Sequence, residues 1–118
     1  VPSDLSIKLL VEDYIYHHHH EFFPVVDNDR LIGCVSTREV KTVPRSEWER
    51  RIVRQIMAPP TGENTVKADT DTLAALKLMN TTGKSRLMVA EGSRLVGIIT
   101  LKDLLKFLTL KMELEEGD

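Results

Sequence analysis

Hydrophobic and polar positions follow the same order twice along this chain. Residues 23–40 read FPVVDNDRLIGCVSTREV and residues 87–104 read LMVAEGSRLVGIITLKDL, with Gly33 and Gly97 lying 64 positions apart (97 − 33). Each copy holds an apolar run, a polar turn, Arg-Leu, an aliphatic residue, Gly, two small or apolar residues, a hydroxyl residue and an acid three positions later. Half-sized copies usually pack face to face, so the pattern predicts paired clefts and favours binding or sensing over one-off catalysis.

Each copy is expected to open with a short strand and an amphipathic helix. Apolar residues recur at near-helical spacing over residues 5–15, and Ser3 or Asp4 is placed to cap this first helix. The second copy repeats the arrangement with a strand-like Val66 and with capping side chains at residues 69–72, ahead of its own apolar face.

A hairpin and a second helix complete each copy. Gly83 ends the first helix of the second copy, because glycine tolerates the left-handed closing conformation. Asn28 and Gly92 suit the tight turn of a hairpin. Each copy therefore reads strand, helix, strand, strand, helix. The expected hairpin strands are residues 23–26, 31–36, 87–89 and 95–100, and the expected second helices are residues 37–41 and 101–114.

Residues 44–60 connect the two copies. Pro44 precedes a helix start with acids near its positive end, and the segment VRQIMAPP at residues 53–60 ends any helix at its proline pair. The arginines of this link are expected on a solvated helix face rather than against an anion or a partner. We therefore expect a first repeat at residues 1–43, a linker helix with a proline-rich link at 44–60, and a second repeat at 61–118.

Composition and charge fit an ordinary folded protein. The chain has 118 residues, of which 42% are hydrophobic and 29% charged, so it suits one compact domain or two packed halves. Its net charge of −2 argues against general nucleic-acid binding. The single cysteine, Cys34, rules out an internal disulfide framework, and its apolar neighbours predict a buried strand residue.

The chain shows no sign of a membrane span or of a targeting segment. No apolar run approaches the ~20 residues that cross a bilayer, and no signal peptide is visible. We expect no direct membrane insertion by this segment. Since Val1 already lies at the start of a folded repeat, we expect a piece of a longer protein. Residues 113–118 are expected to be a frayed helix tail or simply the end of this piece.

These motifs resemble the tandem CBS-domain pair, the cystathionine-β-synthase-type repeat also called a Bateman module. The resemblance covers nearly the whole chain and rests on FPVVD and RLIG in the first copy, RLVGIITLKDLL in the second and VRQIMAPP between them. It implies an α+β fold of two β-α-β-β-α repeats packed with pseudo-two-fold symmetry. It also implies a homodimer, formed through exposed apolar residues of the repeat helices.

The chain is most similar to CBS pairs appended to membrane-embedded zinc metallopeptidases of the site-2 type. This resemblance rests on LSIKLLVEDYI, FPVVD and TVPRSEWERRIVRQIM. It implies a covalently attached effector and a cytoplasmic location, as the cytosolic part of a membrane protein. The HExxH zinc motif of those peptidases is absent here, so neither proteolytic activity nor a metal ligand is assigned to this chain.

The resemblance implies an adenosine-containing ligand such as AMP, ADP, ATP or S-adenosylmethionine, bound in a cleft between the two repeats. The family signature of Gly, two hydrophobic residues, Ser or Thr, two variable residues and Asp maps onto Gly97, Thr100 and Asp103. The glycine permits close backbone approach, the hydroxyl at a helix N-terminus bonds a phosphate, and the acid accepts bonds from both ribose hydroxyls. Val66 and Lys67 lie where the family reads the adenine edge. The entrance residues are Lys84, Ser85, Arg86 and Leu87, of which the two basic residues would neutralise phosphate.

Two acids weaken the same signature in the first copy. Glu39 stands where the family has Asp and adds a methylene to the ribose contact, and Glu21 would repel a phosphate. We therefore expect binding at the second copy rather than the first. In both copies the hydroxyl and the acid can also cap the following helix and complement its dipole, which is compatible with binding. The second candidate site comprises Phe22, Phe23, Gly33, Ser36 and Glu39.

Residues 17–20 are four consecutive histidines between a helix and a strand. Only His17 and His20, three positions apart, share a helical face, whereas a closed zinc site needs about four ligands. The run is therefore expected to be a partly exposed helix terminus, where histidine complements the negative end of the dipole. Adventitious nickel or zinc binding and a pH-sensing role are the alternatives.

The leading functional hypothesis is a regulatory, ligand-sensing module. Ligand would change the angle between repeats or between paired modules and so act on the attached effector, which requires different affinities for two states. The alternative is a ligand-free structural dimerisation module, which is favoured if Leu87 and Met88 plug the second cleft. An enzyme is not supported, because the chain has no nucleophile–base set, HExxH, CxxC or Gly-rich phosphate loop.

Overall fold

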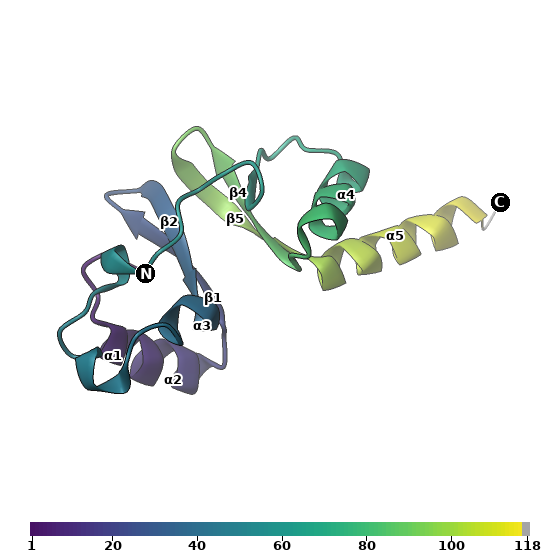
Figure 1. Cartoon of the computed structure of the whole chain (residues 1–118). Coiled ribbons are helices and arrows are strands. Elements are labelled where there is room, and N and C mark those ends of the chain that lie inside the picture. Colours follow the sequence, from purple (N-terminus) through teal and green to yellow (C-terminus); the bar gives the residue numbers. More distant parts are fainter. Residues whose placement is uncertain (117–118) are drawn as a thin grey trace. The chain divides into compact units, whose positions relative to one another are not determined.

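The computed structural model describes residues 1–116 and divides into two compact units, Val1–Pro60 and Thr61–Asp118. Each unit combines helices with an antiparallel hairpin, so the predicted α+β class is confirmed (Figure 1). Gly117 and Asp118, the last residues of the predicted acidic tail, lie outside the described residues. Within residues 1–116, no helix combines the length and the apolar character that a membrane crossing needs.

The first unit opens with a helical stretch and continues into a hairpin. Its elements are α1 (Ile7–Leu9), a π-helical turn (Leu10–Ile15), α2 (Tyr16–His18), β1 (Phe22–Asp27), β2 (Arg30–Ser36), α3 (Thr37–Val40) and 3₁₀ turns at Arg45–Glu47 and Val53–Gln55. Ser6 caps α1 by accepting a hydrogen bond from a backbone N–H of the first turn. The predicted cap at Ser3 or Asp4 is wrong, because the buried Ser3 donates both its hydroxyl and its N–H to the Asp27 carboxylate.

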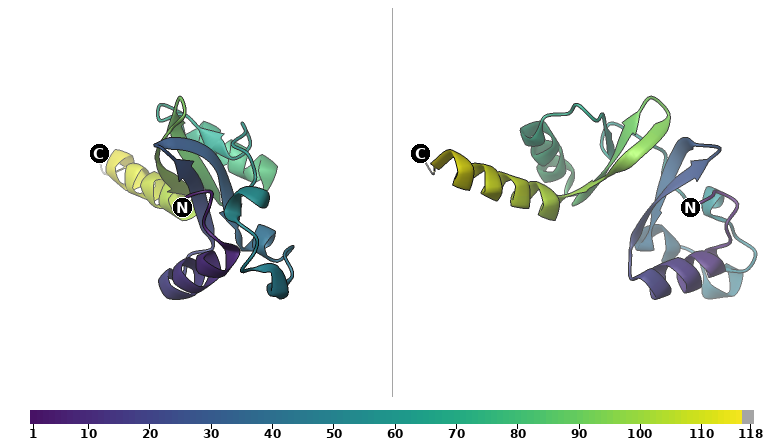
Figure 2. Two further views of the ribbon diagram at one scale, coloured as in Figure 1. Left: turned by 90° about the vertical axis from the view of Figure 1, so that its left-hand side faces the viewer. Right: turned by 180° about the vertical axis from the view of Figure 1, so that it is seen from behind.

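The second unit has the full predicted order of elements. They are β3 (Thr65–Val66), α4 (Thr72–Thr82), β4 (Arg86–Glu91), β5 (Arg94–Thr100) and α5 (Leu101–Glu116). β3 pairs in parallel with β4, and β4 pairs in antiparallel with β5, so the sheet order is β3-β4-β5. α4 ends where Gly83 adopts a left-handed φ of 73°, as predicted. α5 follows β5 without a loop and projects away from the hairpin (Figure 2).

The two hairpins have the same register. β1 and β2 pair Phe22 with Ser36, and β4 and β5 pair Arg86 with Thr100, each residue 64 positions from its counterpart. Both hairpins also carry a register shift at the equivalent step. In place of the strand predicted at the start of the first copy, Val1 donates through its amino group to a carbonyl of β1 at 2.8 Å. The internal repeat seen in the sequence is thus a repeat of backbone geometry.

The residues expected to form a linker helix pack as part of the first unit. Val53 is fully buried in its core, and the Val53 N–H donates to the Leu5 carbonyl at 2.9 Å. The Ile7 N–H donates to the Arg51 carbonyl at 2.9 Å. The predicted helix within residues 44–60 is therefore wrong. Short 3₁₀ turns replace it, and the backbone of residues 51–54 exchanges hydrogen bonds with the start of the chain rather than continuing a helix.

Each unit buries its own apolar side chains. Cys34 on β2 is 5% exposed, which confirms the prediction of a buried strand residue. Apolar side chains of the first helical stretch pack against the hairpin of the first unit, as the spacing of residues 5–15 predicts. The second unit buries a cluster of Ala75, Met79, Leu87 and Leu104. The first unit buries a cluster of Ile7, Leu10, Val11, Phe23, Val25, Val35, Val40 and Val53.

Candidate functional site

In the second unit, the start of β4 and the start of α5 lie side by side. The Leu101 N–H donates to the Ser85 carbonyl at 2.8 Å, and Arg86 pairs with Thr100 in the hairpin register. The basic segment before β4 and the hydroxyl–acid pair at the beginning of α5 therefore meet at one end of the sheet. Five of the predicted site residues are brought together there: Lys84, Ser85, Arg86, Thr100 and Asp103.

The hydroxyl of Thr100 caps α5. It accepts a hydrogen bond from the Asp103 N–H at 3.1 Å, which confirms the predicted capping role. The hydroxyl proton stays available as a donor. Asp103 is exposed in the first turn of the helix, and its carboxylate has no hydrogen-bond or ion-pair partner among residues 1–116. The site thus presents an uncommitted carboxylate beside a helix N-terminus.

A hollow of about 480 Å³ opens beside this cluster, between the last turn of α4 and the first residue of α5. Its volume lies within the range of small-molecule pockets, about 300–1,000 Å³. Lys84 and Ser85 belong to its wall, and neither Lys84 nor Arg86 forms an ion pair within the described part of the chain. The remaining lining residues are Leu76, Met79, Asn80, Gly83 and Leu101.

The sequence did not point to the α4 part of this wall. Asn80 is an exposed residue of the last helical turn, and only the position of that turn just before Gly83 could have indicated it. Leu87 and Met88 are fully buried, and Leu87 packs against Met79 in the core of the unit. Both side chains belong to the core of the unit, and neither lines the hollow.

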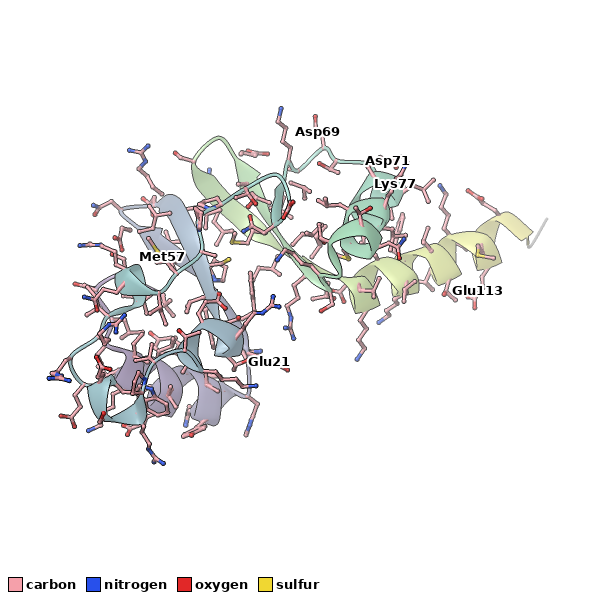
Figure 3. The ribbon with its side chains drawn as sticks, viewed as in Figure 1. Glu21, Met57, Asp69, Asp71, Lys77 and Glu113 are labelled. Carbon is pink, nitrogen blue, oxygen red and sulfur yellow. The ribbon has the colours of Figure 1, made fainter. Side chains whose placement is uncertain are left out.

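Val66 and Lys67 lie elsewhere in the same unit. Val66 pairs with Val89 at the middle of β4, and Val89 in turn pairs with Gly97 on β5. Lys67 lines a second hollow of about 460 Å³, together with the Asp69 loop and the turn between β4 and β5. The loop that carries Asp69 leads into α4 (Figure 3). Within the second unit, Val66 and Lys67 therefore lie apart from the cluster of predicted site residues at the beginning of α5.

The equivalent cluster in the first unit is internally bonded. The Thr37 N–H donates to the Glu21 carbonyl at 3.1 Å, so the backbone bond of the second unit is repeated 64 residues earlier. The Ser36 hydroxyl donates to the Glu39 carboxylate at 2.7 Å and accepts from the Arg38 N–H at 3.2 Å. The acid that would meet a ribose is thus already occupied by the hydroxyl that would meet a phosphate.

The other residues of this second candidate site belong to the hairpin. Phe23 is buried in the core of the first unit, and Phe22 stands beside it at the start of β1. Gly33 lies under the segment that follows the 3₁₀ turn at Val53–Gln55. A Cβ placed on Gly33 would lie 2.5 Å from the Ala58 carbonyl oxygen and 3.0 Å from the Met57 sulfur. Met57 accordingly lies beside β2 (Figure 3).

The histidine run forms the end of the first helical stretch, as predicted. His17, His18, His19 and His20 are all exposed, and His19 adopts the left-handed conformation with a φ of 59°. An open hollow of about 380 Å³ is lined by His17 and His18 with two residues of the preceding turn. Within residues 1–116, no group of three or more His, Cys, Asp or Glu side chains is placed to hold a metal ion.

Solved structures share this fold. The cytosolic domain of the Mg²⁺ channel MgtE in complex with ATP matches 91% of this chain and 43% of its own chain, with a TM-score of 0.75 and 27% identity. CBSX2 in complex with AMP matches 96% of this chain and 87% of its own, with a TM-score of 0.79 and 21% identity. Both are known with an adenine nucleotide bound.

Sequence relatives carry the same module within longer proteins. The zinc metalloprotease MJ0392 of Methanocaldococcus jannaschii is 33% identical over 116 residues, which are 98% of this chain and 30% of that protein. The inosine-5′-monophosphate dehydrogenase of the same organism is 39% identical over 85 residues, or 70% of this chain and 16% of that enzyme. The chain thus spans less than a third of the length of these relatives. Residues 53–110 match the family described as CBS domain. With the same hairpin built twice, the chain belongs to the CBS-domain family.

Proposed function

We propose that this chain is a regulatory module that binds an adenosine-containing ligand at its second repeat and controls an attached effector, a membrane-embedded zinc metallopeptidase. One observation carries the proposal. The basic segment Lys84–Arg86 and the uncommitted carboxylate of Asp103 flank the N-terminus of α5 beside an open hollow of about 480 Å³. The ATP and AMP complexes of structures with this fold support an adenine nucleotide as the ligand class.

Each group has a defined task in this proposal. The Lys84 ammonium and the Arg86 guanidinium neutralise phosphate, the latter through paired hydrogen bonds. The Thr100 hydroxyl donates to a phosphate oxygen, and the positive end of the α5 dipole favours the same charge. The Asp103 carboxylate accepts hydrogen bonds from the ribose hydroxyls. The remaining roles, carried over from the family signature, are adenine recognition by Val66 and Lys67, entrance positions at Ser85 and Leu87, and close backbone approach at Gly97.

The first repeat does not bind the same ligand in this proposal. Its carboxylate at Glu39 is held by Ser36 at 2.7 Å, and Glu21 places a second negative charge at the same end of the hairpin (Figure 3). A phosphate there would break an existing hydrogen bond and meet two acids. The positions of Lys84 and Arg86 carry neither lysine nor arginine in this repeat, since they are His20 and Phe22. The module therefore has one ligand site per chain.

Regulation needs an effector and a means of coupling. The relative MJ0392 is a zinc metalloprotease about three times as long as the aligned segment, which supports a covalently attached peptidase. The cytoplasmic location beside a membrane is part of the proposal and follows from the family resemblance. We also propose a homodimer, because α5 exposes a series of apolar side chains that a second copy can cover. They are Leu105, Phe107, Leu110, Met112 and Leu114, each about half exposed or more.

A ligand-free dimerisation module is the competing function, and the same apolar side chains favour it. Leu114 is 79% exposed and Phe107 is 51% exposed, and this exposure of apolar surface to water is unfavourable unless a second surface covers it. In that case the hollow beside Lys84 would be a surface depression without a ligand. The two functions differ in whether Asp103 takes part in binding.

Calorimetric titration of the chain with AMP, ATP and S-adenosylmethionine tests the proposal. Asp103→Ala should weaken binding by about tenfold to a hundredfold, since a hydrogen bond to a charged group contributes about 1.5–3 kcal/mol. Glu39→Ala is the matched control, because it removes the equivalent acid of the first repeat and should leave the affinity unchanged. Absence of heat for all three ligands at millimolar concentration would refute the sensor and leave the dimerisation module. Loss of binding in Glu39→Ala alone would move the site to the first repeat.

A further inference from the structure

The outer edge of β5 is open, whereas the equivalent edge of β2 is paired. β5 is the last strand of the sheet β3-β4-β5 and has only β4 as a neighbour within the described residues. Ile98 faces Met88 across the hairpin, and the Met88 N–H donates to Asn64 at 2.8 Å, away from β5. Because backbone groups alternate in direction along an antiparallel strand, this pair is of the non-hydrogen-bonded type. The N–H and the carbonyl of Ile98 therefore point outward, toward the open edge.

The first unit shows how such an edge is paired. Cys34 lies 64 positions before Ile98, and its N–H donates to the Ala58 carbonyl at 2.9 Å. The Ala58 N–H donates back to the Cys34 carbonyl at 2.8 Å, which makes a single antiparallel bridge. The segment around Met57 and Ala58 thus adds a short extra strand to the edge of β2.

A glycine makes room for this added strand. A Cβ on Gly33 would lie 2.5 Å from the Ala58 carbonyl oxygen, so only glycine permits the close approach. Gly97 stands at the same position of β5, and a Cβ placed on it would meet no atom within 4 Å. On either side of Gly97, Val96 is 53% exposed and Ile98 is 39% exposed. β5 therefore has the register, the glycine and exposed apolar side chains, but no strand at its outer edge among residues 1–116.

We propose that the edge of β5 at Ile98 binds a further segment of the same polypeptide, outside residues 1–118, in the way that residues 57–58 bind β2. The segment is extended and antiparallel to β5, with an unbranched apolar residue against Gly97 followed by a small residue that exchanges both backbone hydrogen bonds with Ile98. Two relatives of this chain, MJ0392 and the inosine-5′-monophosphate dehydrogenase, are several times longer than the part that aligns. Proteins of this kind therefore contain additional polypeptide that could supply such a segment. Main-chain pairing supplies the affinity and the glycine supplies the selectivity.

The physical advantage of a segment from the same polypeptide is its effective concentration. One two-bond bridge is weak between separate molecules, but a tethered segment is present at millimolar effective concentration. The same reasoning applies to the bridge at Ala58, since that residue is tethered to Cys34 only 24 positions away in the chain (58 − 34).

A fusion tests whether the edge accepts such a segment. The sequence VRQIMAPP is appended to the chain through about 20 Gly and Ser residues, which span about 25 Å on average, enough to return along the roughly 24 Å of α5. Amide exchange at Ile98, followed by NMR, should slow by about tenfold or more relative to the unextended chain, while exchange at Cys34 stays unchanged.

Two controls identify the mode of binding. The first is a fusion whose appended copy reads VRQIMPPP, in which proline removes the N–H needed by the Ile98 carbonyl, so Ile98 should exchange as in the unextended chain. The second is Gly97→Val in the fusion. Its Cβ would meet no atom within 4 Å in the chain itself, whereas the side chain should block the approach of the appended strand. It should leave the thermal unfolding midpoint of the unextended chain unchanged and abolish the protection in the fusion.

Several results would overturn the proposal. Unchanged exchange at Ile98 in the fusion, or equal protection with VRQIMPPP, would show that this edge does not pair. Exchange measured by mass spectrometry should also be slower across residues 95–100 in the longer natural polypeptide than in the 118-residue chain, and equal rates would exclude a segment of the same polypeptide. Protection of Ile98 that rises with the concentration of the unextended chain would assign the edge to a second copy instead.

Discussion

The two repeats share a hairpin but differ in what flanks it. Their strands agree in register, in the position of the irregular step and in the backbone bond that ties the following helix to the preceding loop. In the first unit, residues after α3 return across the hairpin and pair with β2. In the second unit, the chain runs directly from β5 into the 16 residues of α5. The repeats thus share the hairpin and differ in the segments that flank it.

The acids in the first turns of α3 and α5 also differ in their surroundings. Glu39 and Asp103 occupy equivalent positions, yet Glu39 accepts a hydrogen bond from Ser36 whereas Asp103 leaves its carboxylate uncommitted. One added methylene lets the side chain reach back to the hydroxyl three residues earlier. A conservative exchange between two acids therefore separates a helix cap from a candidate ribose-binding group.

The largest expected effect on stability concerns Gly33, which residues 57–58 cover, and its counterpart Gly97, which has no such cover. Gly33→Ala should destabilise the first unit by about 1–3 kcal/mol, because the new Cβ would meet the Ala58 carbonyl oxygen at 2.5 Å and force the bridge apart. Gly97→Ala should change the stability of the second unit by less than about 0.5 kcal/mol, since its Cβ meets open space. Urea unfolding, followed by NMR signals of each unit, measures both. Equal losses in the two variants would contradict the difference between the repeats.

A smaller effect is expected at the ends of the first helices. His19 and Gly83 are 64 positions apart and both adopt left-handed backbone, with φ values of 59° and 73°. Since a side chain is strained there, His19→Gly should stabilise the first unit by about 1 kcal/mol, and Gly83→His should destabilise the second by a similar amount. Thermal unfolding of both variants provides the measurement. His18→Gly, at a helical position one residue earlier, is the control and should destabilise.

Local signals in the sequence predicted the parts that the repeats share. Apolar spacing placed the helices, and Asn28 and Gly92 placed the turns, where both adopt positive φ. Gly83 placed the end of α4. Each of these depends on residues close in sequence. The resemblance to CBS pairs, rather than a local signal, predicted that the basic segment before β4 and the signature on β5 act together. The hairpin register places Arg86 opposite Thr100.

Non-local contacts account for what the sequence did not show. The helix cap assigned to Ser3 failed because Ser3 bonds Asp27, 24 positions away, and the linker helix failed because residues 51–53 bond the start of the chain. The cover over Gly33 comes from Met57 and Ala58, whose apolar and small side chains carry no periodic signal. Helix propensity and apolar spacing describe a segment by itself. The cap and the linker structure depend instead on which distant segment forms hydrogen bonds with that segment.

The smallest expected effect lies in the cluster that replaces the predicted cap. The Ser3 hydroxyl and N–H donate to the Asp27 carboxylate and lower its pKa below the ordinary value of 3.8, with Arg54, whose guanidinium nitrogen lies 3.9 Å from the carboxylate, adding to the shift. Because the pKa is lower in the folded state, the ionised carboxylate stabilises the first unit above a pH of 3.8, and this contribution is lost as the pH falls through the folded-state pKa.

Asp27→Asn should therefore flatten the acid side of the stability profile of the first unit. The asparagine keeps an acceptor for Ser3 but cannot titrate, so the unfolding midpoint should fall less on acidification than in the parent chain. Glu91→Gln is the matched control in the second repeat, since Glu91 is the equivalent, exposed residue and has no ion pair in the part of the chain that the structure describes. Unfolding midpoints measured from about pH 2 to 6 distinguish the variants. If Asp27→Asn and the parent lost stability in parallel, the Ser3–Asp27 contact would not be what distinguishes the acid response of the first repeat from that of the second.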